Sequence, residues 1–246
     1  MFCLNTGSDM CSLNSSNEEG SGVINLITLF LMSGVTSSIK NKYIDAIMKN
    51  GIDKDIRNIV LDCACSDGKL AIIECLIKYG VDIHFRNEHA LQLASHNGHL
   101  DIVELLIKHG AADGWRHLGD ADIHAQNDLA LRRAAENGHL DVVELLIKHG
   151  ADIHEYKEEA LLHATKKGYL YVVECLIKNG AEGRRLLGGA ADIHACKDCA
   201  LWLASYHGHL AIVECLISHG ADIHAQNDYA LRQASYNGHL DVVKWY

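Results

Sequence analysis

The sequence predicts an all-α solenoid of stacked helix pairs, and three observations carry this prediction. A Gly-His-Leu type of turn recurs at steps of 30 or 40 residues, and its glycine is called the inner glycine: Gly68, Gly98, Gly138, Gly168, Gly208 and Gly238. In five units a second, outer glycine follows twelve residues later: Gly80, Gly110, Gly150, Gly180 and Gly220. The chain contains no proline, which suits a protein built mostly of helices. Self-similarity at such a period is typical of repeat architectures.

Each unit is expected to contain two helices. The first begins at an Ala-Leu pair such as Ala130-Leu131 and ends just before the inner glycine, with an apolar face. The second runs from the Gly-His-Leu turn to the outer glycine, which suits a left-handed position after the helix C-terminus. Asp128, Asp198 and Asp228 stand just before the first helices, where we expect them to cap free N–H groups.

The unit ALRRAAENGHLDVVELLIKHGADIH and its copies resemble the ankyrin repeat, over about residues 52–246. Two features depart from the family pattern of 33 residues with a Thr-Pro-Leu-His motif: the basic period is 30, and pairs such as Leu129-Ala130 replace Thr-Pro. The resemblance implies an ankyrin-type helical solenoid of about seven helix pairs with shortened hairpin loops. The 30-residue, proline-free style is also similar to ankyrin proteins of giant DNA viruses of amoebae.

The repeats divide the chain into three parts. Residues 1–21 are rich in Ser, Asn and Gly and are expected to form a disordered tail. Residues 22–51 look like a divergent N-terminal capping repeat, because YIDAIMKNG aligns with VVELLIKHG. Residues 52–246 hold the regular repeats, and the last one stops within its second helix and is expected to be truncated.

Each of the two 40-residue steps contains a ten-residue insertion, at about 111–120 and 181–190. Both insertions carry a Gly-x-Arg-x-Leu-Gly motif, and insertions in solenoids map to loops that often line the binding face. Copying of one insertion by unequal recombination explains the shared motif equally well, and the two explanations are compatible.

Composition excludes several classes of function. A net charge of −10 disfavours a nucleic-acid partner and an acidic membrane surface. The odd number of cysteines, nine, without a secretory signal favours an intracellular, reduced protein, cytoplasmic in location, and in the host cytoplasm if the viral resemblance holds. The ten-residue apolar run 23–32 is too short to span a membrane.

Histidines and cysteines do not predict a metal, cofactor or catalytic site. Twelve of the seventeen histidines recur with the repeat, and equivalent residues in stacked units lie too far apart to share one zinc ion. Cys196 and Cys199 form a single C-x-x-C at variable positions, and Cys75, Cys175 and Cys215 replace core leucines. We therefore expect no enzyme activity, no bound metal and no cofactor.

Variable positions of the first helices and the inserted loops mark the predicted binding surface. In an ankyrin-type array these parts line a concave face, and Trp, Tyr and Arg dominate interface hot spots. The leading hypothesis is a scaffold that binds a protein partner, a host protein if the chain is viral. The alternative is a structural or neutral member of an expanded repeat family, in which Trp202 and Tyr229 merely fill gaps between units. The predicted contact residues are Trp115, Arg116, Arg132, Glu136, Lys166, Arg184, Arg185, Trp202, Tyr206, Tyr229, Arg232 and Tyr236.

Overall fold

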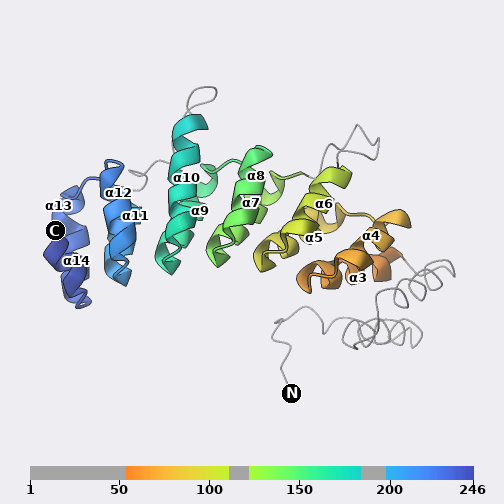
Figure 1. Ribbon diagram of the computed structural model, residues 1–246, viewed down its shortest axis with the longest axis horizontal. Coiled ribbons are helices and arrows are strands. Elements are labelled where there is room, and N and C mark those ends of the chain that lie inside the picture. The colour runs from red at the N-terminus through yellow and green to blue at the C-terminus, as the bar shows by residue number, and fades with distance from the viewer. Residues whose placement is uncertain (1–53, 111–121, 184–197) are drawn as a thin grey trace, which may run out of the picture.

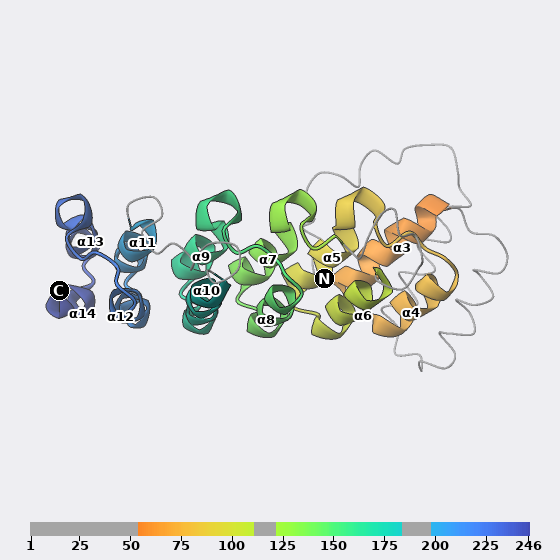
Figure 2. The ribbon, with the colours of Figure 1, turned by 90° about the horizontal axis from the view of Figure 1, so that it is seen from above.

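The computed structural model describes residues 54–110, 122–183 and 198–246, and within these ranges it contains twelve helices and no strand. The helices form two rows, with the first helix of every unit in one row and the second helix in the other (Figures 1 and 2). The first helices are α3 (Lys54–Ser66), α5 (Phe85–Asn97), α7 (Ala125–Asn137), α9 (Glu155–Lys167), α11 (Cys199–His207) and α13 (Ala225–Tyr236). The second helices are α4 (Leu70–Lys78), α6 (Leu100–Gly110), α8 (Leu140–Lys148), α10 (Leu170–Gly183), α12 (Leu210–Ser218) and α14 (Leu240–Trp245). The predicted all-α solenoid is therefore confirmed.

The core runs continuously between the two rows. In the α7–α8 unit, Leu131 and Ala134 of the first helix and Val142, Val143 and Leu146 of the second are fully buried. Small alanines let neighbouring first helices approach closely, so α5 packs against α7 and α7 against α9. The alternation of small and branched residues along the first and second helices thus sets the stacking of the units.

The inner turn joins each unit to the next one. Gly98 has a φ of 74°, a left-handed conformation that favours glycine, and the imidazole of His139 lies directly over it. A Cβ on Gly98 would lie 2.4 Å from the Nδ1 atom of His139. The Nε2–H group of His139 donates to the carbonyl oxygen of His96, at 3.0 Å. The same contact joins His99 to Ser66, His209 to Lys166 and His239 to Tyr206, so these recurring histidines have the structural role that their spacing predicts.

The first helices α5, α7 and α13 begin with a left-handed turn. Gln126, Asn127 and Asp128 at the start of α7 all have φ between 53° and 58°. The carboxylate of Asp128 accepts the backbone N–H of Asp152 in the next unit, at 2.9 Å, and lies 3.0 Å from Nδ1 of His124. The predicted helix-capping role is wrong, because the left-handed turn directs this carboxylate to the neighbouring unit rather than to its own helix.

The same correction holds in the other units. Asp198 makes no capping bond to α11, and its carboxylate accepts the backbone N–H of Asp222, at 3.1 Å. Asp228 pairs with Nδ1 of His224, at 2.7 Å. At Asp128 and Asp198, a buried carboxylate at this position therefore connects successive units, whereas Asp228 is half-exposed and pairs within its own unit.

Outer glycines behave in two ways. Gly80, Gly150 and Gly220 have positive φ and follow the ends of their helices, as predicted. In contrast, Gly110 is the last residue of α6, and Gly180 lies inside α10, which continues to Gly183. The prediction of a loop at 181–190 is therefore wrong for residues 181–183, where Ala and Glu favour helix continuation. The rest of both insertions, the tail 1–21 and the divergent unit 22–51 lie outside the described residues.

Candidate protein-binding surface

Pairs of side chains link neighbouring first helices on the surface of their row, which we call the first-helix face. Each pair joins the residue after the Ala-Leu pair of one unit to the residue before the Ala-Leu pair of the next, and we call it a boundary pair. Nδ1 of His89 lies 2.9 Å from the carboxylate of Asp62. Arg132 forms an ion pair with Glu159, and the rings of Trp202 and Tyr229 meet edge to face, with centroids 5.7 Å apart. The boundary pair therefore occurs in three chemical forms: a histidine with a carboxylate, an arginine with a carboxylate, and two aromatic rings.

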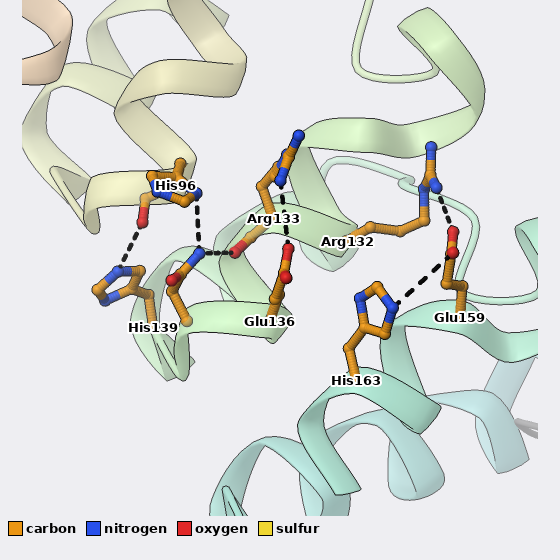
Figure 3. Close-up of polar contacts among 8 residues, drawn as sticks. His96, Arg132, Arg133, Glu136, His139, Glu159 and His163 are labelled. Carbon is orange, nitrogen blue, oxygen red and sulfur yellow. Dashed lines mark hydrogen bonds and ion pairs between the residues drawn. The ribbon is translucent and has the colours of Figure 1, made fainter. Parts of the chain in front are cut away.

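Arg132, a predicted contact residue, is largely occupied by such a pair. Its side chain is only 16% exposed, and besides Glu159 it donates to the carbonyl oxygen of Gln126, at 3.0 Å. Glu159 also faces His163, whose Nε2 lies 3.8 Å away (Figure 3). The structure thus places Arg132 in a contact between units, where it also holds the left-handed turn of its own helix.

Aromatic side chains gather on α11 and α13. The ring of Trp202 meets that of Tyr206 edge to face at 6.4 Å, in addition to its contact with Tyr229. The guanidinium group of Arg232 lies over the ring of Tyr229, 5.5 Å from its centroid, and donates to the carbonyl oxygen of Gln226, at 3.3 Å. The four predicted contact residues Trp202, Tyr206, Tyr229 and Arg232 therefore form one cluster.

The two residues before each inner glycine form a second feature, which we call the inner-turn ridge. In its first part the side chains are paired, because Asn137 contacts Nδ1 of His96 at 2.9 Å and Arg133 lies 3.3 Å from Glu136 (Figure 3). Toward the C-terminus the ridge is open. Lys166 is exposed, Tyr206 is 40% exposed and Tyr236 is 88% exposed. Of the predicted contact residues, these three present the most accessible surface to a partner, together with the exposed Arg232.

Sequence reasoning missed His207 and Lys167 on this ridge. The ring of His207 lies 4.9 Å from that of Tyr206 and is stacked on His209 at 5.9 Å. Burial lowers the pKa of His207, and the nearby His209, Lys166 and His239 lower it further. Both residues occupy the position directly before the inner glycine, so comparing the copies at that position would have found them.

Cysteine thiols show no sign of activation. Cys75 and Cys175 are buried as predicted, whereas Cys215 is half-buried. Burial is the main cause that raises the pKa of Cys175 and Cys215, so these thiols stay protonated. Within the described ranges, no three His, Cys, Asp or Glu side chains converge as metal ligands, and no helix there has the length and hydropathy to cross a bilayer.

Four predicted contact residues cannot be placed. Trp115, Arg116, Arg184 and Arg185 belong to the two insertions and lie outside the described residues. Their contribution to the binding surface stays a prediction.

Comparisons with known proteins agree with the repeat architecture. Two family models describe ankyrin repeats: one, for three copies, matches residues 31–116 and 115–185, and the other, for many copies, matches residues 201–245. Together the matches cover well over half of the chain. A comparison with curated protein sequences gave no match.

Proposed function

Because the chain belongs to the ankyrin repeat family, whose repeats are generally protein–protein interaction modules, we propose that it is a scaffold that binds a partner protein on its first-helix face. The observation that carries this proposal is the exposed pair Tyr206 and Tyr236 beside Arg232, on α11 and α13. Large aromatic and guanidinium side chains supply most of the energy of protein interfaces. Nothing in the packing of the repeats requires Tyr236 to be a tyrosine, since its side chain is 88% exposed.

Site-specific crosslinking in the native cell tests this proposal. A photoreactive amino acid in place of Tyr236 should attach to a discrete partner protein, whereas the same group in place of Lys148, on α8 in the other row, should not. Equal crosslinking from both positions, or none from Tyr236, would contradict the proposal.

We also propose where the partner protein comes from. The similarity of the 30-residue, proline-free repeats to ankyrin proteins of amoebal giant viruses supports a host protein as the partner and the host cytoplasm as the location. Cys63, Cys65, Cys175 and Cys215 are free thiols, which supports a reducing compartment. Crosslinked partners identified by mass spectrometry would decide whether they are encoded by the host.

The alternative is a structural or neutral repeat protein without a specific partner. The boundary pairs favour it for part of the predicted surface, because Arg132, Trp202 and Tyr229 all contact neighbouring units. It does not explain the exposed tyrosines. A saturable partner lost on changing Tyr206 and Tyr236 would exclude this alternative.

A further inference from the structure

The first-helix face of the last three described units combines exposed cationic side chains with an absence of carboxylates between the Ala-Leu pair and the inner turn. The stretches 160–170, 200–210 and 230–240, each from the Ala-Leu pair to the inner turn, contain no Asp or Glu, and neither does 90–100, although the chain as a whole carries a net charge of −10. The first three of these stretches contain Lys166, Lys167 and Arg232, all of them exposed. The corresponding stretches of two earlier units, 60–70 and 130–140, contain Asp62, Asp67 and Glu136. Because 90–100 contains no Lys or Arg, a lysine or arginine without a carboxylate in the same stretch occurs, among the described units, only in the last three.

On the other row of helices, exposed carboxylates alternate with exposed lysines. Exposed carboxylates occur along the second helices, at Glu74, Asp101, Glu104, Asp141, Glu144, Glu174, Glu214 and Asp241. On the first-helix face, Glu159 is held by Arg132 and Glu136 by Arg133. In the C-terminal half, Glu174 and Asp241 each have a lysine on the same helix, Lys178 and Lys244, whereas the stretch 160–170 with Lys166 and Lys167 contains no carboxylate.

Hydrogen bonds of the inner turn bring the cationic and aromatic groups together. His209 donates to the carbonyl oxygen of Lys166, at 3.2 Å, and His239 donates to that of Tyr206, at 2.8 Å. His207 stacks on His209 between these two links, in contact with Tyr206. The ridge from Lys166 to Tyr236 therefore carries ammonium, imidazole and phenol groups on three successive units.

We infer that the partner presents an acidic segment, rich in Asp and Glu, to this strip on α9, α11 and α13. The inference rests on the proposed function and names the chemistry of the partner. Lys166, Lys167 and Arg232 would pair with carboxylates, and Tyr206 and Tyr236 would pack against the aliphatic parts of the segment. Electrostatic complementarity of this kind selects the partner and raises the rate of association, and salt weakens it.

Binding of labelled poly-L-glutamate to the full chain, followed by fluorescence anisotropy, tests the inference. We expect saturable binding at about 20 mM salt that weakens about tenfold or more at about 200 mM. The double variant Lys166→Glu with Lys167→Glu should lose about tenfold or more in affinity. The matched control, Lys148→Glu with Lys178→Glu on α8 and α10, changes the net charge equally and should lose less than about twofold.

Three results would overturn the inference. One is the absence of binding at low salt, and another is an equal loss in the two double variants, since it would mean that only net charge matters. The third is tighter binding of poly-uridylate than of polyglutamate through the same lysines, since it would identify a nucleic-acid surface. A partner that crosslinks at Tyr236 but docks through a region without acidic residues would refute this inference alone and leave the scaffold function standing.

Discussion

Arg132 on α7 and Glu159 on α9 form an ion pair across the boundary between two units, at the same structural position where Trp202 and Tyr229 pack edge to face farther along the chain. Both pairs span 27 residues of sequence, as does the pair of Asp62 and His89. A solenoid whose units contact only their neighbours depends on such boundaries for its cooperativity. The side chains of these pairs differ from boundary to boundary, although their position is the same. Each pair therefore sets how strongly its two adjacent units stabilise each other.

Coupling between Arg132 and Glu159 can be measured with a double-mutant cycle. We expect Arg132→Ala to lower the free energy of unfolding by about 1–2 kcal/mol, because the arginine also holds the carbonyl oxygen of Gln126. The interaction term with Glu159→Ala should be about 0.5–1 kcal/mol, since both side chains are only partly exposed. Urea unfolding of the four proteins gives this term. A value near zero would mean that the pair is incidental.

Substitution of an inner glycine should cost more than that of an equally strained outer glycine. Gly98→Ala and Gly80→Ala both place a Cβ in the left-handed region, which costs about 1–2 kcal/mol. Only in Gly98→Ala would the Cβ collide with His139, whereas nothing lies within 4 Å at Gly80. We expect Gly98→Ala to be the more destabilising by about 1 kcal/mol or more in urea unfolding. Equal losses would show that His139 moves aside freely.

The imidazole of His139 combines packing over Gly98 with a hydrogen bond to His96. His139→Ala removes both and should cost about 2–3 kcal/mol of unfolding free energy. His139→Tyr should cost only about 1 kcal/mol, because Tyr169 occupies the equivalent position over Gly138 in the next unit. Thermal unfolding of the two variants compares them directly. If the tyrosine variant is as unstable as the alanine variant, the ring contributes little by packing.

Asp128 should be needed as a hydrogen-bond acceptor. Asp128→Ala leaves the N–H group of Asp152 unpaired and should cost about 1–3 kcal/mol at neutral pH. The matched control is Asp228→Ala, whose side chain is 51% exposed in the last described unit, and it should cost less than about 0.5 kcal/mol. Comparable losses at the two sites would contradict a specific link between units.

The contribution of Asp128 to the free energy of unfolding should change with pH in one direction. Burial raises its pKa above the ordinary 3.8, so the folded protein holds this proton more tightly than the unfolded chain. Its contribution to stability is therefore greatest below about pH 3.8 and declines as the pH rises through the higher pKa of the folded state. The neutral Asp128→Asn keeps a side-chain acceptor and lacks this titration. The unfolding free energy of wild type minus that of Asp128→Asn, measured from pH 3.5 to 7, should fall with rising pH, and a rise would refute the assignment.

Partner binding should depend on the exposed tyrosines. Tyr206→Ala and Tyr236→Ala should each weaken binding by roughly 30-fold or more, the cost of truncating an interface anchor. Lys148→Ala, in the second-helix row, should leave affinity unchanged. Circular dichroism should show an intact array in all three variants. A loss for Lys148→Ala as large as for the tyrosine variants would place the binding surface on the second helices.

The sequence by itself determined the repeat, the two helices of each unit and their buried faces. These features follow from local spacing, since Ala-Leu pairs, branched second helices and recurring glycines repeat within each unit. The sequence also predicted a structural role for the recurring histidines, because a residue that recurs with the repeat usually stabilises the repeat itself. The exposed tyrosines on α11 and α13 were singled out by comparing the copies with one another.

Only the tertiary structure decided where side chains go between units. Asp128 reads as a helix cap from its position, but three left-handed residues turn its carboxylate toward Asp152, and no local pattern specifies that turn. In the sequence, Arg132 and Tyr236 both occupy variable positions of a first helix, and nothing there distinguishes their environments. The stacking of α9 on α7 buries Arg132 against Glu159, whereas Tyr236 on α13 stays 88% exposed. A contact across 27 residues depends on how whole units pack rather than on the spacing within one of them.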